Sequence, residues 1–172
     1  GILRKVGFEV RESSADAWRT GSETGWGINL GSSINTFGKD KILLQVVYGE
    51  GIQNYMNDAP VDVGIEDNFS NPVTPIVGKA LPVLGIVAFL DLNWNARWTS
   101  TVGYSMVDID NSDAQMDDAF KKGQYASANL LYYPVENVMV GAELLWGERE
   151  DFDGDDGDDT RVQISFKYNF EI

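Results

Sequence analysis

The densest group of residues that could do chemistry in this sequence is an acidic run between residues 148 and 159, which holds eight carboxylates. Carboxylate oxygens are the ligands that calcium prefers. Three positions of the run have the one-three-five spacing of a calcium loop, namely Asp151, Asp153 and Asp155. The next glycine falls one position late, and Val162 stands where such a loop carries a glutamate. Two interpretations stay open: a calcium site, or a solvated and disordered loop.

The sequence contains no histidine and no cysteine. These side chains are the usual bases and nucleophiles near neutral pH, so Ser-His-Asp triads and cysteine-ligated zinc are excluded. Glu9 and Glu143 have the chemistry of an acid and base pair, but nothing in the sequence brings them together. We therefore predict that the chain is not an enzyme, and we expect no cofactor apart from the calcium considered above.

The charges are unevenly distributed. With 27 acidic and 13 basic residues the net charge is −14, which disfavours nucleic-acid binding. Four Gly/Asp-rich segments hold 21 of the acidic residues and only three basic ones: residues 12–24, 49–80, 108–120 and 148–160. In a lipopolysaccharide leaflet such carboxylates can share divalent cations with lipid phosphates. The alternative is that they simply keep a surface solvated.

Between these segments, apolar residues alternate with polar or small ones. The clearest case runs over eleven residues, from Val162 to Ile172. The same period of two recurs in residues 6–10, 26–34, 44–48, 84–94, 98–106, 126–132 and 138–146. A period of two is typical of β-strands with one apolar face. The sequence therefore predicts an all-β, antiparallel protein with eight strands.

The connections between these strands alternate in length. Residues 37–40, 94–97 and 133–137 are short turns, whereas the four acidic segments are long. No apolar run approaches the roughly 20 residues of a membrane-spanning helix. Short turns at one end and long loops at the other are typical of outer-membrane β-barrels, so we expect both chain ends on the periplasmic side.

Aromatic residues fall near both ends of the apolar faces. Those at the long-loop ends are Trp26, Tyr48, Tyr104 and Trp146, and those at the short-turn ends are Trp94, Trp98, Tyr132, Tyr168 and Phe170. Two aromatic girdles are typical of a barrel that spans a membrane. The alternative is a soluble sandwich or lipocalin-like carrier that buries the same apolar face. We predict one transmembrane β-barrel domain over residues 1–172, in the bacterial outer membrane.

The opposite, polar faces would line the lumen. Their charged residues are Lys5, Glu9, Arg11, Asp91, Glu143 and Lys167. These side chains either set the electrostatic profile of a channel or pair with one another across strands. Ten positions assigned to these faces are glycine: Gly7, Gly25, Gly27, Gly31, Gly49, Gly85, Gly103, Gly123, Gly141 and Gly147.

An eight-stranded barrel is just filled by its inward side chains, so this lining predicts a wider barrel of which the chain is one part. Two alternatives remain. The glycines could serve sheet curvature, or a closed eight-stranded barrel could be filled by an inward-folded loop from residues 49–80.

Two stretches near the C-terminus support a specific resemblance. Residues 132–147 (YYPVENVMVGAELLWG) and 162–170 (VQISFKYNF) resemble the C-terminal end of DcaP-like outer-membrane porins. Residues 24–30, 44–52 and 120–126 fit the same family. One departure is that Glu171 and Ile172 follow Phe170, whereas outer-membrane strands usually finish on the aromatic residue.

The resemblance implies a barrel of about sixteen strands, trimeric, through which small anionic solutes such as dicarboxylates diffuse. This chain would be its second half. The family's substrate-binding arginines lie mostly in the other half, so none is assigned here. We accordingly expect a passive porin that assembles as a homotrimer among membrane lipid and lipopolysaccharide. The alternative is a small non-conducting outer-membrane barrel with a structural or adhesive role through its acidic loops.

Overall fold

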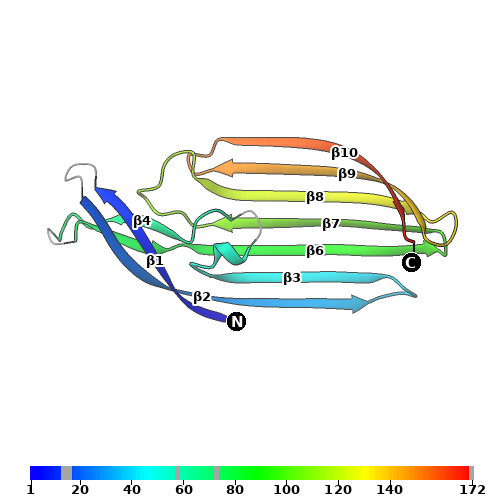
Figure 1. The fold of residues 1–172 in the computed structure, drawn as a ribbon, viewed down its shortest axis with the longest axis horizontal. Helices are drawn as coiled ribbons and strands as arrows, with labels where there is room; N and C mark the ends of the chain where they lie inside the picture. The colour runs from blue at the N-terminus through cyan, green and yellow to red at the C-terminus, as the bar shows by residue number, and fades with distance from the viewer. Residues whose placement is uncertain (13–16, 57–58, 72–73, 171–172) are drawn as a thin grey trace.

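The computed structural model describes residues 1–12, 17–56, 59–71 and 74–170. Within these residues, eight strands form one antiparallel sheet in which each strand pairs with its neighbours along the chain (Figure 1). The strands of this sheet are β1 (Ile2–Glu12), β2 (Ala17–Asn35), β3 (Lys41–Glu50), β6 (Pro82–Asn95), β7 (Trp98–Ile109), β8 (Phe120–Tyr132), β9 (Val138–Asp151) and β10 (Asp156–Tyr168). The predicted all-β class and the eight predicted strands are confirmed, as are the three short turns.

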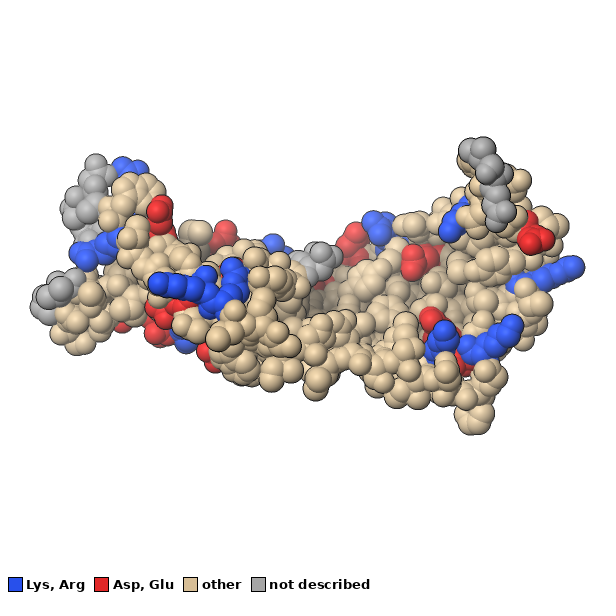
Figure 2. All heavy atoms as spheres, turned by 60° about the horizontal axis from the view of Figure 1, so that its bottom comes forward, with Lys and Arg blue, Asp and Glu red and all other residues tan. Residues whose placement is uncertain are grey.

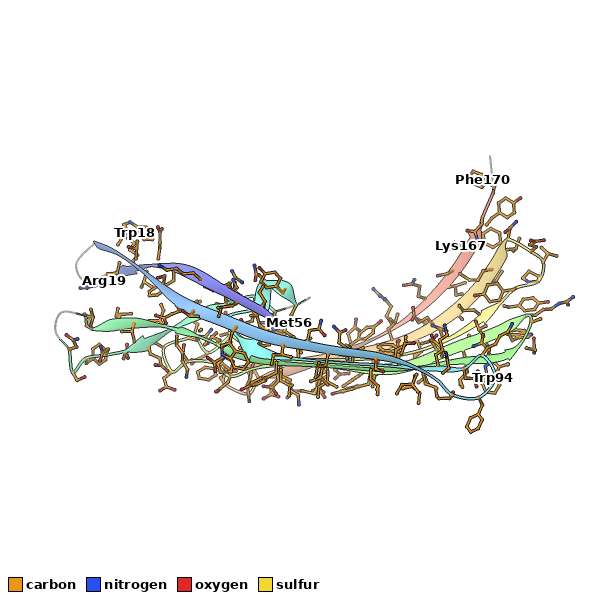
Figure 3. All side chains as sticks on the ribbon, turned by 90° about the horizontal axis from the view of Figure 1, so that it is seen from below. Trp18, Arg19, Met56, Trp94, Lys167 and Phe170 are labelled. Carbon is orange, nitrogen blue, oxygen red and sulfur yellow. The ribbon has the colours of Figure 1, made fainter. Side chains whose placement is uncertain are left out.

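The sheet is curved and open (Figure 3). β1 lies at one edge, where it pairs with β2, and β10 lies at the other edge, where it pairs with β9. Val6 is opposite Glu23 of β2, and no described residue of β1 pairs with β10. The described residues therefore do not close an eight-stranded barrel. No helix among them is long and apolar enough to cross a membrane.

The convex face of the sheet is apolar and uncovered. Ten of its aliphatic and aromatic side chains are between 42% and 79% exposed: Ile28, Leu30, Leu44, Val46, Val102, Leu130, Leu144, Val162, Ile164 and Phe166. Charged side chains gather toward the two ends of the molecule and along the hollowed face (Figure 2). Exposed apolar surface of this extent indicates contact with a membrane or with another protein. A soluble sandwich would bury this face, and no described element covers it.

The long connection between β3 and β6 folds back over the concave face. Gly51, whose φ is 63°, allows the chain to reverse as it leaves β3. The connection then forms a short 3₁₀ helix, η1 (Gln53–Tyr55), and a separate two-stranded sheet of β4 (Val63–Asp67) and β5 (Ile76–Ala80). A small core beneath it consists of Ile52, Leu81, Val83 and Ile109, each at most 2% exposed. The sequence predicted only a loop here.

Two of the four predicted long loops are wrong. Residues 17–24 belong to β2 and pair with β1, and residues 13–16 lie outside the described part of the chain. Residues 148–151 and 156–160 continue β9 and β10, which join through a tight turn at Gly154, where φ is 92°. Backbone pairing continues without an apolar face because the ladder's hydrogen bonds do not depend on side-chain polarity. Glu171 and Ile172 also lie outside the described residues.

Candidate functional site

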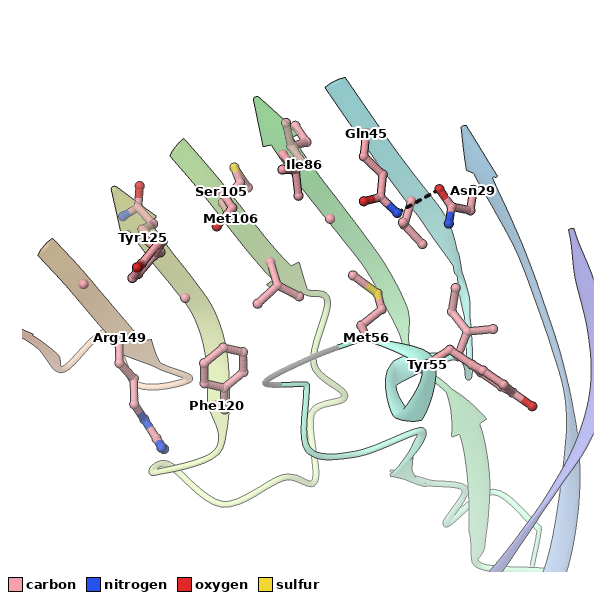
Figure 4. A pocket seen from close by; sticks show the side chains of 18 of the residues that line it. Asn29, Gln45, Tyr55, Met56, Ile86, Ser105, Met106, Phe120, Tyr125 and Arg149 are labelled. Carbon is pink, nitrogen blue, oxygen red and sulfur yellow. Dashed lines mark hydrogen bonds between the residues drawn. The ribbon is translucent and has the colours of Figure 1, made fainter. Parts of the chain in front are cut away.

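The concave face holds a hollow of about 1170 Å³ (Figure 4). Its wall is formed by β2, β3 and β6 to β10, with η1 projecting into it from one side. Polar side chains such as Asn29, Gln45 and Tyr125 share this wall with aliphatic ones. Gln45 donates a 3.1 Å hydrogen bond from Nε2 to Oδ1 of Asn29 across the β2–β3 pair. The hollow is therefore an open surface of mixed polarity that is larger than most pockets for small ligands.

Glycines on the concave face form a seat for residues 51–56, here called the inward turn. A Cβ atom at Gly27 would lie 2.5 Å from Cδ1 of Ile52, and one at Gly49 would lie 2.8 Å from the same atom. A Cβ at Gly85 would collide with Cε of Met56. Close approach of the turn to the sheet thus requires small residues at these positions. Residues 51–56 thus fold inward, but they cover an open sheet and not the interior of the closed eight-stranded barrel considered as an alternative.

Several other concave glycines are covered by bulky neighbours rather than facing open space. Phe89 lies against Gly103, Leu131 against Gly141, and Phe120 against Gly123. In a sheet, large side chains often lie flat over a glycine of the adjacent strand, which gains contact area and permits curvature. The number of glycines therefore does not measure the width of a lumen. These glycines do not support the predicted wider barrel.

Leu81 closes the base of the connection that begins with the inward turn. Its carbonyl accepts a 2.9 Å hydrogen bond from the amide of Gly51 and a 3.0 Å bond from Nε2 of the fully buried Gln53. Its amide donates to the carbonyl of Asp62 at 3.1 Å. These bonds satisfy backbone groups that burial would otherwise leave unpaired. The start of the inward turn is consequently tied to Leu81, where the connection returns to the sheet.

A row of polar side chains crosses the concave face near the short turns. Directly opposed residues place Lys41, Asp91, Thr101, Asn129, Glu143 and Gln163 side by side on six strands. The hydroxyl of Thr101 donates to Oδ1 of Asp91 at 2.8 Å, and its amide donates to Oδ1 of Asn129 at 2.9 Å. The structure thus places Asp91 and Glu143 in one row. Lys167 also lies on the concave face, opposite Met139. Their role in lining a pore stays a prediction.

The predicted face of β1 is wrong. Lys5, Glu9 and Arg11 are opposite Thr24, Thr20 and Trp18, whereas Arg4 is opposite Gly25, which faces the inward turn. Phe8, on the same side as Arg4, packs where Cβ atoms of Gly21 and Gly78 would lie. Phe8 is therefore covered by β5 rather than exposed on the convex face, where Leu3 is 78% exposed. Lys5, Glu9 and Arg11 lie on the face of β1 opposite the hollow.

Several basic residues of the concave face were not predicted, and neither were the apolar residues that overhang it. Lys41, Arg149 and Arg161 are opposite the concave residues Asp91, Gly123 and Leu145, respectively. Extending each strand by its own alternation would have found them. Tyr55, Met56 and Phe120 also line the hollow, and only the fold of the inward turn and its neighbouring loop brings them there.

The acidic run forms a hairpin rather than a cage of ligands. Asp151 pairs with Nε of Arg149 at 2.6 Å, and Oδ1 of Asp153 accepts a 3.0 Å bond from the amide of Asp155. Among the described residues, no group of three or more acidic side chains is arranged to hold a metal ion. Calcium binding by these three aspartates stays a prediction, and the arrangement of their side chains does not support it.

One ion pair ties this hairpin to β8. Nζ of Lys121 lies 2.5 Å from Oε1 of Glu150. The hydrogen bond from Lys121 lowers the pKa of Glu150 and raises the pKa of Lys121 itself. Both side chains are partly exposed to solvent, so the pair contributes little to stability.

Comparisons with known proteins agree with this architecture. No family model and no curated protein matches the sequence. The structure is similar to the crystal structure of the outer membrane channel DcaP of Acinetobacter baumannii, with a TM-score of 0.70 and 18% sequence identity. The similarity covers 98% of this chain and 51% of that chain, so this chain spans about half the length of that protein. The resemblance inferred from the sequence is confirmed at the level of the fold.

Proposed function

We propose that the chain forms part of the wall of an outer-membrane porin through which small hydrophilic solutes diffuse passively. The observation that carries the proposal is a curved sheet with opposite faces of opposite character. Its convex face exposes aliphatic side chains, as lipid requires, and its concave face has the hollow and the polar row from Lys41 to Gln163. The similarity in fold to an outer membrane channel supports the same proposal.

The open sheet is proposed to be one half of a barrel of about sixteen strands. Two features support this. The outer edges of β1 and β10 have no partner strand among the described residues, and an open sheet edge is not tolerated within a bilayer. In addition, the chain matches about half of a channel protein. The strand count around one pore, from cryo-electron microscopy of the natural protein in detergent, tests this; a ring of eight would contradict it.

A weak preference for anions is proposed, with small dicarboxylate-like solutes as the class to examine first. On the concave face from β3 to β10, four basic residues accompany four acidic ones: Lys41, Arg149, Arg161 and Lys167 with Asp91, Glu143, Asp151 and Asp159. Arg4 of β1 adds one more positive charge. A small positive excess in a confined aqueous path enriches anions without binding any one of them tightly. The reversal potential across a salt gradient measures this preference. A reversal potential of the sign expected for a cation-selective channel would contradict it.

Membrane insertion, lipopolysaccharide contact and a homotrimer complete the proposal. The uncovered apolar face supports contact with lipid or with neighbouring subunits. Chemical cross-linking of the protein in native outer membranes should give trimers, and their absence would contradict this part. A cysteine at Leu144 should be shielded from a water-soluble thiol reagent, whereas one at Asn129 should react. The opposite pattern would invert the assignment of faces.

The decisive experiment is conductance in a planar bilayer. The purified full-length protein should give ohmic channels whose conductance rises in proportion to salt concentration. Heat-unfolded protein at the same concentration is the control for detergent artefacts. Persistent electrical silence from folded protein would contradict the porin proposal and would favour a barrel without a pore.

A further inference from the structure

We propose that Arg4 is a positioning residue that holds the inward turn over the concave face and thereby sets the width of the solute path. This inference rests on the proposed channel function and adds a specific residue to it. Arg4 lies on β1, a strand that is distant in sequence from the turn. Its side chain is only 20% exposed. A cation so largely withdrawn from water requires compensating partners, and all of those described belong to the connection after β3.

Those partners are spread along the connection. Nη1 of Arg4 lies 3.5 Å from the carbonyl oxygen of Gly51, at the start of the inward turn. The same nitrogen donates to Oδ1 of Asn54 in η1 and, at 3.1 Å, to Oδ2 of Asp62. Its guanidinium carbon lies 5.2 Å from the ring centre of Tyr55, within cation–π range. The side chain of Arg4 therefore contacts the start of the inward turn, the 3₁₀ helix η1 and Asp62, which precedes β4.

Asp62 extends the same network. Its other oxygen, Oδ1, accepts a 3.2 Å hydrogen bond from the amide of Asn54. Its side chain is 17% exposed, so the Arg4–Asp62 pair is more sheltered than the Lys79–Glu66 pair of the adjoining small sheet, whose side chains are 36% and 39% exposed. Sheltered, charge-assisted bonds are stronger and more directional than exposed ion pairs. Arg4 and Asp62 together restrain the exposed end of η1.

The apolar core beneath the turn restrains a different part of it. Ile52 is packed among Leu81, Val83 and Ile109, which fixes the point where the turn leaves the sheet. Tyr55 and Met56, beyond that point, line the hollow, and Tyr55 is 62% exposed. Without Arg4 the anchored end would stay in place, while these two side chains would move away from the wall or fluctuate. The predicted consequence is a wider and less steady path.

The test compares two neighbouring substitutions in the full-length protein, R4Q and K5Q. Both remove one positive charge from β1, but Lys5 faces away from the inward turn. R4Q should raise single-channel conductance on the order of 1.5-fold and increase open-channel current noise. It should also admit larger neutral polymers. K5Q should change none of these quantities, and R4K should restore part of the wild-type behaviour.

The folded state of each variant shows whether a substitution acts only by preventing folding. Heat-modifiable migration on a gel shows whether each variant forms a folded barrel, and R4Q is expected to match the wild type. If R4Q does not fold, D62N examines the same contact from its other side and should raise conductance and noise likewise. The double variant R4Q/D62N should equal the stronger single variant rather than their sum, because both remove one interaction.

Failure of this inference is distinguishable from failure of the channel proposal. A silent wild-type protein would overturn the channel itself. A conducting wild type with folded R4Q and D62N variants of identical conductance, noise and polymer cut-off would overturn only the role of Arg4. Equal effects of R4Q and K5Q would assign the change to charge rather than to the position of the turn, and would also overturn it.

Discussion

Residues 51–81 and residues 148–160 both connect predicted strands, and they behave in opposite ways. Residues 148–160 hold eight acidic residues among thirteen, whereas residues 51–81 hold four among thirty-one and many apolar side chains. The first connection folds back over the concave face and buries Ile52 and Leu81, which are 2% and 0% exposed. The second continues two strands outward to a tight turn and buries none of its own side chains.

The difference lies in the apolar residues of the first connection and in the surface of the sheet that they contact. Residues 148–160 contain one apolar side chain, Phe152, so they have little to gain by folding onto the sheet. The inward turn contains Ile52 and Met56. Ile52 packs against Gly27 and Gly49 of the sheet, and Met56 packs against Gly85. A connection folds inward when it carries apolar side chains and when the wall has room for them.

The largest expected effect comes from filling that seat. A Cβ at Gly49 would collide with the carbonyl oxygen of Trp26 and approach Cα of Gly27 within 2.6 Å, and backbone atoms cannot move aside cheaply. Gly49→Val should therefore lower the free energy of unfolding by about 4 kcal/mol, above the usual cost of overpacking. Urea unfolding in lipid vesicles, followed by tryptophan fluorescence, measures this.

Gly31→Val is the matched control for that substitution. Gly31 lies on the same face and the same strand as Gly27, but the nearest atom to its added Cβ is the Leu44 carbonyl oxygen at 3.8 Å. Its cost should stay within about 0.5 kcal/mol. Equal costs for the two valines would contradict the close approach of neighbouring atoms to Gly49.

A smaller effect is expected from emptying the apolar core beneath the turn. Ile52→Ala leaves a cavity beside Leu81, Val83 and Ile109 and should destabilise the docked turn by about 3 kcal/mol. The turn should then become sensitive to added protease while the strands resist cleavage. Val61→Ala, at a side chain that is 40% exposed in the same connection, should leave cleavage unchanged. Protection of Ile52→Ala equal to that of the wild type would show that the core does not hold the turn.

A still smaller effect is expected at the outward hairpin. Replacing residues 152–155 by Asn-Gly should close β9 and β10 with a two-residue turn. The replacement removes two backbone hydrogen bonds, from the amide of Phe152 to the carbonyl of Ala119 and from the amide of Asp153 to the carbonyl of Asp117. It removes no residue that lines the hollow. Conductance should be unchanged, and stability should fall by about 1 kcal/mol or less. A marked change of conductance would place the hairpin in the solute path and would remove the contrast between the two connections.

The smallest effect concerns pH. Lys121 lowers the pKa of Glu150 below its ordinary 4.5, so the ion pair is present above that pH and is lost as the pH falls through the lowered value. In the inward connection, Glu66 raises the pKa of Lys79 above 10.5, so that pair is present below 10.5 and is lost as the pH rises through the raised value. Carbon NMR of the Glu150 carboxyl should give a midpoint below 4.5, and Lys121→Gln should return it to that value. An unchanged midpoint in the variant would contradict the pairing.

Much of the sheet was predictable because alternation is a local property. Leu144 and Val162 were assigned to one face from their spacing alone, and they lie opposite each other on the uncovered convex face. Asp91 and Glu143 were likewise assigned to the other face, and the structure brings both into one polar row. In each case the side-chain period of two carries the information, and no distant contact is needed.

The failures share a physical cause. β1 alternates as clearly as the other strands, but Phe8 and Val6 lie on its concave side, and β5 covers Phe8 where contact with lipid was expected. The chain by itself determined which side chains share a face and where most strands lie, because neighbouring residues dictate both. Only the tertiary structure decided what each apolar face packs against, where the inward turn lands and which charges reach the hollow, because these depend on contacts between segments far apart in the chain.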